Sequence, residues 1–574
     1  MPTTFAAEEL QRYLQRMIGV QPPIVGDGGA HTLVVGAPVP PRALPPDGET
    51  YIIEPEPSRI MLRAGSSRAL LSAVYALLER CGCRWSLDDP GAEQVPRLDG
   101  KVELERIEHT PRFAVRGYTS DIMTWHYTQP EHFHSRLNDD RAFIDWMGKS
   151  GANAFLYIRH PFDTQLTIPE LLVDFQRRGI ALEYGGHVIP LLVPRELYRE
   201  HPDYFPASAD GARSDHGNLC SSNAAALATA SRNAVQYVRD YPEMSVVHIW
   251  GADLWHGGWC HCADCASFSV QDQSLRVCNA VARGLEEAGV ARPVCYLAYH
   301  DTLDAHLTVH PHDNVVVEFA PRERCYGHAL NDPACAANRR YVAALERYVE
   351  LFAGRVRLFE YYGDAILFFG CSVPLTAVIA ADMDYYARLG VPGITMLQFG
   401  TYSLWAYPLN VLAFAAASQG RCEPAQIRQD HCTQFGPHAA AAAEMFCEVE
   451  RLLRPVATYG DIRRPPAAAD AARALLGPVE RALPALERVS EQLVALDGEV
   501  LAAQALLMRY TRGVLAAVRQ QLQDTLAGHP RDAEAQYTEA LSVLDAVERR
   551  FKGLWGSVDL QVIHRFFALA AHAE

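Results

Sequence analysis

The sequence predicts an α/β protein built on a (β/α)8 TIM barrel, with a small α/β domain before the barrel and a helical domain after it. Between residues 106 and 420, eight short apolar stretches alternate with longer amphipathic stretches. The apolar stretches are nearly continuous, which is typical of a parallel sheet covered on both faces. Strand signals stop after this region. We therefore expect three domains, over residues 1–105, 106–420 and 421–574.

The first domain begins with a predicted helix, because FAAEELQRYLQRMIGV places four apolar residues on one helical face: Ala6, Leu10, Tyr13 and Met17. The stretches TLVVGAP and ETYIIEPEPSRIMLRAG are typical of strands joined by turns. A second helix is predicted over SSRALLSAVYALLERCG, with Ser66 or Ser67 as its N-cap.

Eight strands are predicted in the barrel region: FAVRGYTSD, NAFLYIRH, IALEYGGH, SVVHIWGAD, PVCYLAYHD, NVVVEFAPR, VRLFEYYGD and GITMLQFG. An open, doubly wound sheet is the alternative arrangement. No GxGxxG follows a strand and no GxxxxGK[ST] is present, so nucleotide-binding versions of that sheet have no support.

The last domain shows long helical periodicity without obvious chemistry. Pro478 and Pro484 are expected to mark a first turn or a kink. Alanine runs in this domain reflect helix propensity. The helical tail is also a candidate surface for forming a homo-oligomer.

The net charge of -16 argues against nucleic acid or an anionic membrane as the main partner. No run of about 18 apolar residues is present, so we expect no membrane span. The first twenty residues lack the basic and apolar regions of a secretory signal, which predicts a cytoplasmic protein. The 14 cysteines are then expected to be reduced.

Polar and aromatic residues follow the predicted strands, and in a TIM barrel the carboxyl ends of the strands form one rim that carries the active site. This rim is expected to bring together Asp121, His187, Asp253, Trp255, Tyr299, His300, Arg322, Glu360, Tyr361, Tyr362 and Gln398. Paired carboxylates among aromatic residues suit glycoside hydrolysis. No cofactor is needed for such chemistry.

Some of these residues have a second interpretation. Asp121 is equally suited to anchoring a loop, and His187 to a hydrogen-bonded place in the core. Glu318 is a strand residue that could pair with Arg322 or Arg324. Asp253 and Glu360, at the ends of strands four and seven, would lie opposite each other across the mouth of the barrel. We therefore predict that these two are the catalytic carboxylates.

Several stretches resemble known carbohydrate-active enzymes. SSRALLSAVYALLERCGCRW followed by GAEQVP resembles the small accessory domain of α-glucuronidases and β-hexosaminidases, and PRFAVRGYTSD resembles their first barrel strand. The barrel resembles glycoside hydrolase family 163, which includes endo-β-N-acetylglucosaminidases, in EYGGH, HPDYFP, NLCSSN, GAD…WCHCADC, CYGHALNDPAC and FEYYGD. The resemblance spans roughly residues 1–450 and implies a carbohydrate substrate.

The resemblance also implies roles. Many retaining barrel glycosidases carry the acid/base on strand four and the nucleophile on strand seven, which would be Asp253 and Glu360. The β-hexosaminidases use an Asp-Glu pair on strand four, and here Ala252 and Leu254 flank Asp253 instead. A mechanism assisted by the substrate's acetamido group would need another strand to supply a polar residue: Tyr299, Tyr361 or Tyr362.

Two rival functions remain open. An α-glucuronidase-like inverting hydrolase of acidic sugars would need a cationic cleft, for which Arg116, Arg159, Arg322 and Arg324 are candidates. A catalytically silent sugar-binding barrel would bind without turnover. For a cytoplasmic protein, a small oligosaccharide or glycoside is the favoured ligand.

Three cysteines, Cys260, Cys262 and Cys265, form a C-x-C-x-x-C motif after strand four. Clustered thiols in a reducing compartment indicate a metal more often than a disulfide. Zinc needs a fourth ligand, and Cys220 after strand three could supply it, with His256 or His261 as substitutes. The prediction is a structural zinc site, with a set of packed thiols as the alternative.

Overall fold

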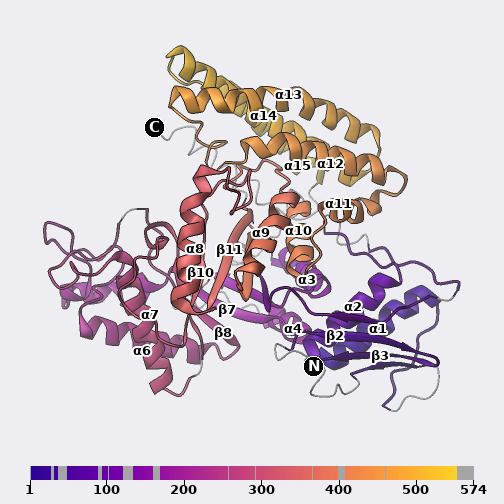
Figure 1. Ribbon diagram of the computed structural model, residues 1–574, viewed down its shortest axis with the longest axis horizontal. Helices are drawn as coiled ribbons and strands as arrows, with labels where there is room; N and C mark the ends of the chain where they lie inside the picture. Colours follow the sequence, from indigo (N-terminus) through magenta and orange to yellow (C-terminus); the bar gives the residue numbers. More distant parts are fainter. Residues whose placement is uncertain are drawn as a thin grey trace.

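The structure is a computed structural model. It describes residues 2–26, 32–36, 48–87, 93–100, 102–119, 133–158, 169–255, 257–290, 292–364, 366–398, 407–458 and 460–551. A closed barrel of eight parallel strands forms its centre, with a small mixed sheet before it and a group of helices after it (Figure 1). The predicted fold class is therefore confirmed. None of the described helices is long and apolar enough to cross a membrane.

The N-terminal part contains helices α1 (Pro2–Ile18) and α2 (Ser67–Arg80) and strands β1 (Thr32–Val35), β2 (Tyr51–Glu56), β3 (Arg59–Ala64) and β4 (Ile107–His109). The sheet order is β1-β3-β2-β4, with β1 and β3 parallel and the other pairs antiparallel. The predicted face of α1 is buried as expected. Ser66 caps α2, because its hydroxyl accepts the backbone N–H of Ala69 at 3.1 Å.

All eight predicted strands are present in the barrel: β5 (Val115–Thr119), β6 (Ala154–Ile158), β7 (Ala181–Gly186), β8 (Met244–Ile249), β9 (Val294–Ala298), β10 (Val315–Phe319), β11 (Val356–Gly363) and β12 (Gly393–Gln398). Each strand pairs with its neighbour in the sequence, and β12 closes the barrel on β5. Every residue of β11 and β12 is buried, since one side fills the barrel and the other lies under helices.

The helices that follow these strands are α3 (Phe133–Ser150), α4 (Pro169–Arg178), α5 (Ile189–Leu192), α6 (Ala224–Asp240), α7 (Val270–Glu287), α8 (Arg339–Phe352), α9 (Thr376–Arg388) and α10 (Pro408–Ser418). The N-terminal part packs against the end of the barrel where the strands begin. Arg68 donates to the carbonyl of Ala152 just before β6, and Arg116 at the start of β5 pairs with Glu49 at 2.5 Å.

The C-terminal helices are α11 (Pro424–Cys432), α12 (Ala439–Leu453), α13 (Ala469–Ala495), α14 (Glu499–Ala527) and α15 (Glu534–Phe551). Pro478 and Pro484, expected at a first turn or kink, both lie inside α13. The helices pack on the segment that follows β11: Tyr510 donates to the carbonyl of Phe369 at 2.6 Å. The last predicted helix, DLQVIHRFFALAAH, lies outside the described residues.

Candidate active site at the barrel rim

The inside of the barrel, below the rim, is closed by a buried charged network. The Arg357 guanidinium on β11 donates to both carboxylate oxygens of Glu183 on β7, at 2.8 and 2.6 Å. His248 on β8 lies between Glu183, at 2.8 Å, and Glu318, at 3.3 Å. Burial alone would raise the pKa of Glu183, but the charge of Arg357 and the hydrogen bonds from His248 and Arg357 together hold it well below its usual range. Glu318 therefore pairs with Arg357 (3.5 Å) and not with Arg322 or Arg324.

Above this network, Trp250 forms an aromatic floor under the rim. It is buried, and its ring contacts His248 below, with centroids 5.1 Å apart, and His187 above, at 5.4 Å. Phe359 packs against its edge at 5.9 Å, and Tyr361 packs against Phe359 at 5.1 Å. The floor separates the charged interior from the polar groups of the rim.

Asp253 lies on the rim after β8, and its side chain is 61% exposed. The Nε2 atoms of His187 and His300 are 3.9 and 4.0 Å from its Oδ1. Nδ1 of His187 lies 2.6 Å from the carbonyl oxygen of Gly251, and since a carbonyl only accepts, Nδ1 carries the donated proton. The other ring nitrogen, Nε2, faces Asp253. The two imidazoles thus flank one exposed carboxylate.

Glu323, in the loop after β10, lies on the other side of His300. Its Oε1 is 2.8 Å from Nδ1 of His300, at an angle outside that of a hydrogen bond. The result is a row of carboxylate, imidazole and carboxylate. His300 has φ +49°, an uncommon conformation for a residue other than glycine, of the kind that concentrates at functional sites.

Aromatic and cationic groups complete the rim. Trp255 is 55% exposed and its ring meets that of His300 at 4.3 Å, while Tyr299 lies 3.6 Å from the same ring. Arg322 pairs with Asp364 at 3.1 Å and lies 5.7 Å from the ring of Tyr361. Burial raises the pKa of both Tyr299 and Tyr361, so their phenols stay protonated.

Seven of the residues predicted at the rim therefore come together there: Asp253, His187, Trp255, Tyr299, His300, Arg322 and Tyr361. Asp121 lies outside the described residues. Glu323 was not predicted, because it stands in the run Arg322-Glu323-Arg324, where it resembles an ordinary solvated charge. Its one signal was its place directly after a barrel strand.

The structure does not place Glu360 where the predicted pair of catalytic carboxylates, Asp253 and Glu360, requires it. It faces away from the barrel interior, fully buried, with the Tyr386 hydroxyl of α9 as hydrogen-bond donor and Arg324 at 3.4 Å. Burial raises its pKa to about 7, with Asp382 adding to the shift and Arg324 opposing it. Successive strand residues point to opposite faces, and Arg357, Phe359 and Tyr361 occupy the inner one. Glu360 is thus not placed to contact a substrate at the rim.

Tyr362 and Gln398 also differ from expectation. Tyr362 shares the outer face of β11 with Glu360, is fully buried, and donates its hydroxyl to Asp382 at 2.8 Å. Gln398, at the end of β12, is buried beside Gly363. Neither side chain is presented to the open rim as a substrate-binding group would be.

The four predicted cysteines lie together and join two rim loops. The Sγ atom of Cys220, after β7, is 3.7 Å from that of Cys262 and 3.8 Å from that of Cys265, after β8. With Cys260 included, all four sulfurs lie within 4.8 Å of one another. An ion bound tetrahedrally at 2.3 Å separates its sulfur ligands by about 3.8 Å. The cluster could therefore hold a metal ion.

The loops joined by this cluster also position Asp253. Asn218, two residues before Cys220, is buried and accepts the backbone N–H of Ala252 through its side chain at 2.7 Å. Its own backbone N–H donates to the carbonyl of Gly258 at 2.8 Å. Ordering the cysteine loop therefore orders the turn that carries Asp253.

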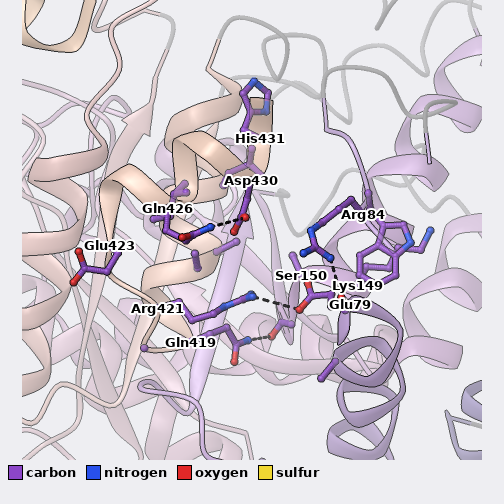
Figure 2. Close-up of a pocket in the computed structure, with 18 of the residues that line it drawn as sticks. Glu79, Arg84, Lys149, Ser150, Gln419, Arg421, Glu423, Gln426, Asp430 and His431 are labelled. Carbon is purple, nitrogen blue, oxygen red and sulfur yellow. Dashed lines mark hydrogen bonds and ion pairs between the residues drawn. The ribbon is translucent and has the colours of Figure 1, made fainter. Parts of the chain in front are cut away.

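A separate groove of about 1220 Å³ lies between the N-terminal part, the barrel and α11 (Figure 2). Residues that precede β5 and β6, such as His109 and Ser150, line it, so it is at the end of the barrel opposite the rim. Arg421 pairs with Glu79 at 3.3 Å in this groove, and Arg112 pairs with Asp384. It has none of the strand-end groups that a barrel active site uses.

The fold and the rim define a class: TIM-barrel proteins that share the fold of glycoside hydrolases. One similar structure is a GH138 enzyme targeting pectin rhamnogalacturonan II, at 10% identity and a TM-score of 0.58, covering 97% of this chain and 73% of the other. Another is a family 89 glycoside hydrolase from Clostridium perfringens, in complex with 2-acetamido-1,2-dideoxynojirmycin, at 10% identity and a TM-score of 0.56, covering 96% and 66%. No curated protein sequence matched. The chain belongs to the family defined by a domain of unknown function, DUF4838, whose model matches residues 92–446.

Proposed function

We propose that this protein is a glycoside hydrolase that cleaves a 2-acetamido-hexoside, such as a β-N-acetylglucosaminide, in a small glycoside or oligosaccharide. The observation that carries the proposal is the exposed Asp253 carboxylate, flanked by two imidazoles on the rim of a barrel with the glycoside hydrolase fold. The resemblance of its motifs to glycoside hydrolase family 163 supports the same reaction.

In this mechanism Asp253 donates a proton to the leaving oxygen and later activates water. Glu323 attracts the His300 imidazole and so keeps its Nε2 directed toward Asp253. The acetamido group of the substrate attacks the anomeric carbon, with the Tyr299 phenol as the group that orients it. Trp255, exposed beside His300, offers a flat apolar surface for a sugar ring.

The arrangement of the arginines disfavours an α-glucuronidase-like function. Arg116 lies at the opposite end of the barrel and Arg324 behind β11, while Arg322 is neutralised by Asp364. Arg159 lies outside the described residues. No cluster of unpaired arginines faces the described part of the rim.

The test is hydrolysis of paired aryl glycosides that carry either an acetamido or a hydroxyl group at C2. Asp253→Asn should lower kcat/KM by about 10²–10⁴-fold on substrates with poor leaving groups, and much less on dinitrophenyl glycosides, which leave without a proton. Asp313→Asn, an exposed carboxylate where the strands begin, is the matched control. Equal turnover of both sugar types would show that the acetamido group does not take part in the reaction. Full activity of Asp253→Asn would refute the role of Asp253.

We propose further that the four-cysteine cluster holds a structural zinc ion, because its sulfur separations fit zinc–thiolate geometry. Cys265→Ser should release one zinc ion per chain, measured by metal analysis, and should lower thermal stability. An unchanged zinc content would leave packed thiols as the correct description.

A further inference from the structure

A second group of metal-ligating side chains lies in the loop between β10 and α8. The Sγ atoms of Cys325 and Cys335 and a ring nitrogen of His328 all lie within 4.8 Å of one another. Nδ1 of His328 is 3.3 Å from the Cys325 Sγ atom. Both cysteines are free thiols and buried, and His328 is half-buried. The group is separate from the four-cysteine cluster, which joins the loops after β7 and β8.

The backbone around this group is tightly held. The fully buried Asn338 accepts the N–H of Cys325 at 2.8 Å and donates to the carbonyls of Cys325 and Ala329, at 3.1 and 3.2 Å. A Cβ atom on Gly327 would lie 2.3 Å from the carbonyl oxygen of Arg454, so glycine is required where the turn presses on the segment after α12. The three side chains therefore converge from a loop that is already fixed.

The chemistry of the three groups is that of a zinc site. Thiolate and imidazole are ligands that zinc prefers, and the spacing of Cys325 and His328, Cys-x2-His, is short enough for both to reach one ion. With zinc–sulfur and zinc–nitrogen bonds of 2.3 and 2.0–2.1 Å, a tetrahedron separates sulfur from nitrogen by about 3.5 Å. The observed distance of 3.3 Å between the Cys325 Sγ and His328 Nδ1 atoms is close to this value.

We propose that Cys325, His328 and Cys335 bind a zinc ion whose fourth position is taken by water or another small ligand. Among the described residues, no further Cys, His, Asp or Glu joins this group. A third set, His248, Cys295 and Glu318, does not qualify, because the Arg357 guanidinium already lies 3.5 Å from its one carboxylate, Glu318.

The ion would fix the loop that begins with Arg322 and Glu323. Glu323 is two residues before Cys325, and Arg324 between them is buried against Asp382. Binding would therefore hold Glu323 against His300. This consequence for the rim, unlike the binding itself, depends on the proposed function.

The test is metal analysis of the full-length chain, independent of any activity. The protein is stripped with a chelator under reducing conditions and titrated with Co²⁺, and bound cobalt and thiolate-to-cobalt absorption are recorded. The double variant Cys325→Ser with Cys335→Ser should bind one ion fewer per chain than the parent. His328→Asn, a milder change at a half-buried site, should weaken the binding of that ion at least tenfold.

Cys447→Ser, which removes an exposed cysteine outside both groups, should bind as much cobalt as the parent. Cys265→Ser should leave the absorption of the second site in place, so the two sites are distinguished. Unchanged cobalt binding by both Cys325→Ser with Cys335→Ser and His328→Asn would overturn the proposal. A Cys325–Cys335 disulfide in protein purified without reductant, found by peptide mass analysis, would also overturn it.

Discussion

Glu360 provides the sharpest test of the site, because a buried carboxyl with a raised pKa should affect stability and leave catalysis alone. Its pKa is about 7 in the folded protein, against an ordinary value of 4.5. Below pH 4.5 the carboxyl is protonated in both the folded and unfolded states. Between pH 4.5 and 7 only the unfolded state releases the proton, so the free energy of unfolding falls as the pH rises.

The size of this fall follows from the shift. Each pKa unit corresponds to about 1.4 kcal/mol, so Glu360 should lower the free energy of unfolding by ~3 kcal/mol between pH 4.5 and pH 8. Glu360→Gln resembles the protonated acid in shape and cannot ionise. The variant should match the parent near pH 4 and exceed its stability by ~3 kcal/mol at pH 8.

The assay is urea unfolding of the parent and Glu360→Gln at several pH values, compared as differences at each pH. Glu350→Gln, an exposed glutamate of α8, controls for the loss of a carboxylate. A stability difference that does not change with pH would refute the assignment of a raised pKa. A large loss of kcat in Glu360→Gln at pH 6 would refute the conclusion that Glu360 is remote from the substrate.

Three other changes test separate parts of the structure. Arg357→Met leaves two buried carboxylates without their cation and should lower the free energy of unfolding by about 3–5 kcal/mol, measured by urea unfolding, with Arg347→Met on the surface as control. Trp255→Ala should raise KM several-fold while changing stability by less than about 0.5 kcal/mol, and an unchanged KM would exclude a sugar platform there. Tyr510→Phe removes the bond from α14 to the carbonyl of Phe369 and should cost about 1 kcal/mol in thermal unfolding, whereas no change would mean that this bond does not hold the helices to the barrel.

The barrel could be predicted from the sequence because each strand is an apolar run long enough to span it, and the helices between the runs are amphipathic. The sequence did not allow us to predict which side chains of β11 point into the barrel. All eight residues from Val356 to Gly363 are buried, so no alternation of polar and apolar residues indicates which side faces the interior. Glu360 and Tyr361 are neighbours near the end of the strand, yet only Tyr361 is on its inner face.

Contacts between loop residues could be predicted only where the residue type has few possible roles. Cysteine is rare and its clustering after adjacent strands was visible in the sequence, so Cys220 could be joined to the other three thiols. Glu323 was not visible, because charged residues are common in loops and its contact with His300 depends on the unusual backbone of His300.

The charged network inside the barrel limits how the family can diverge. Glu183, His248, Glu318 and Arg357 come from four different strands. Each of these buried side chains is paired with at least one of the others. A relative that lost Arg357 alone would keep the buried carboxylates of Glu183 and Glu318 without the guanidinium that pairs with them. These four positions should therefore covary as a set among homologous sequences, changing together to an apolar layer or not at all.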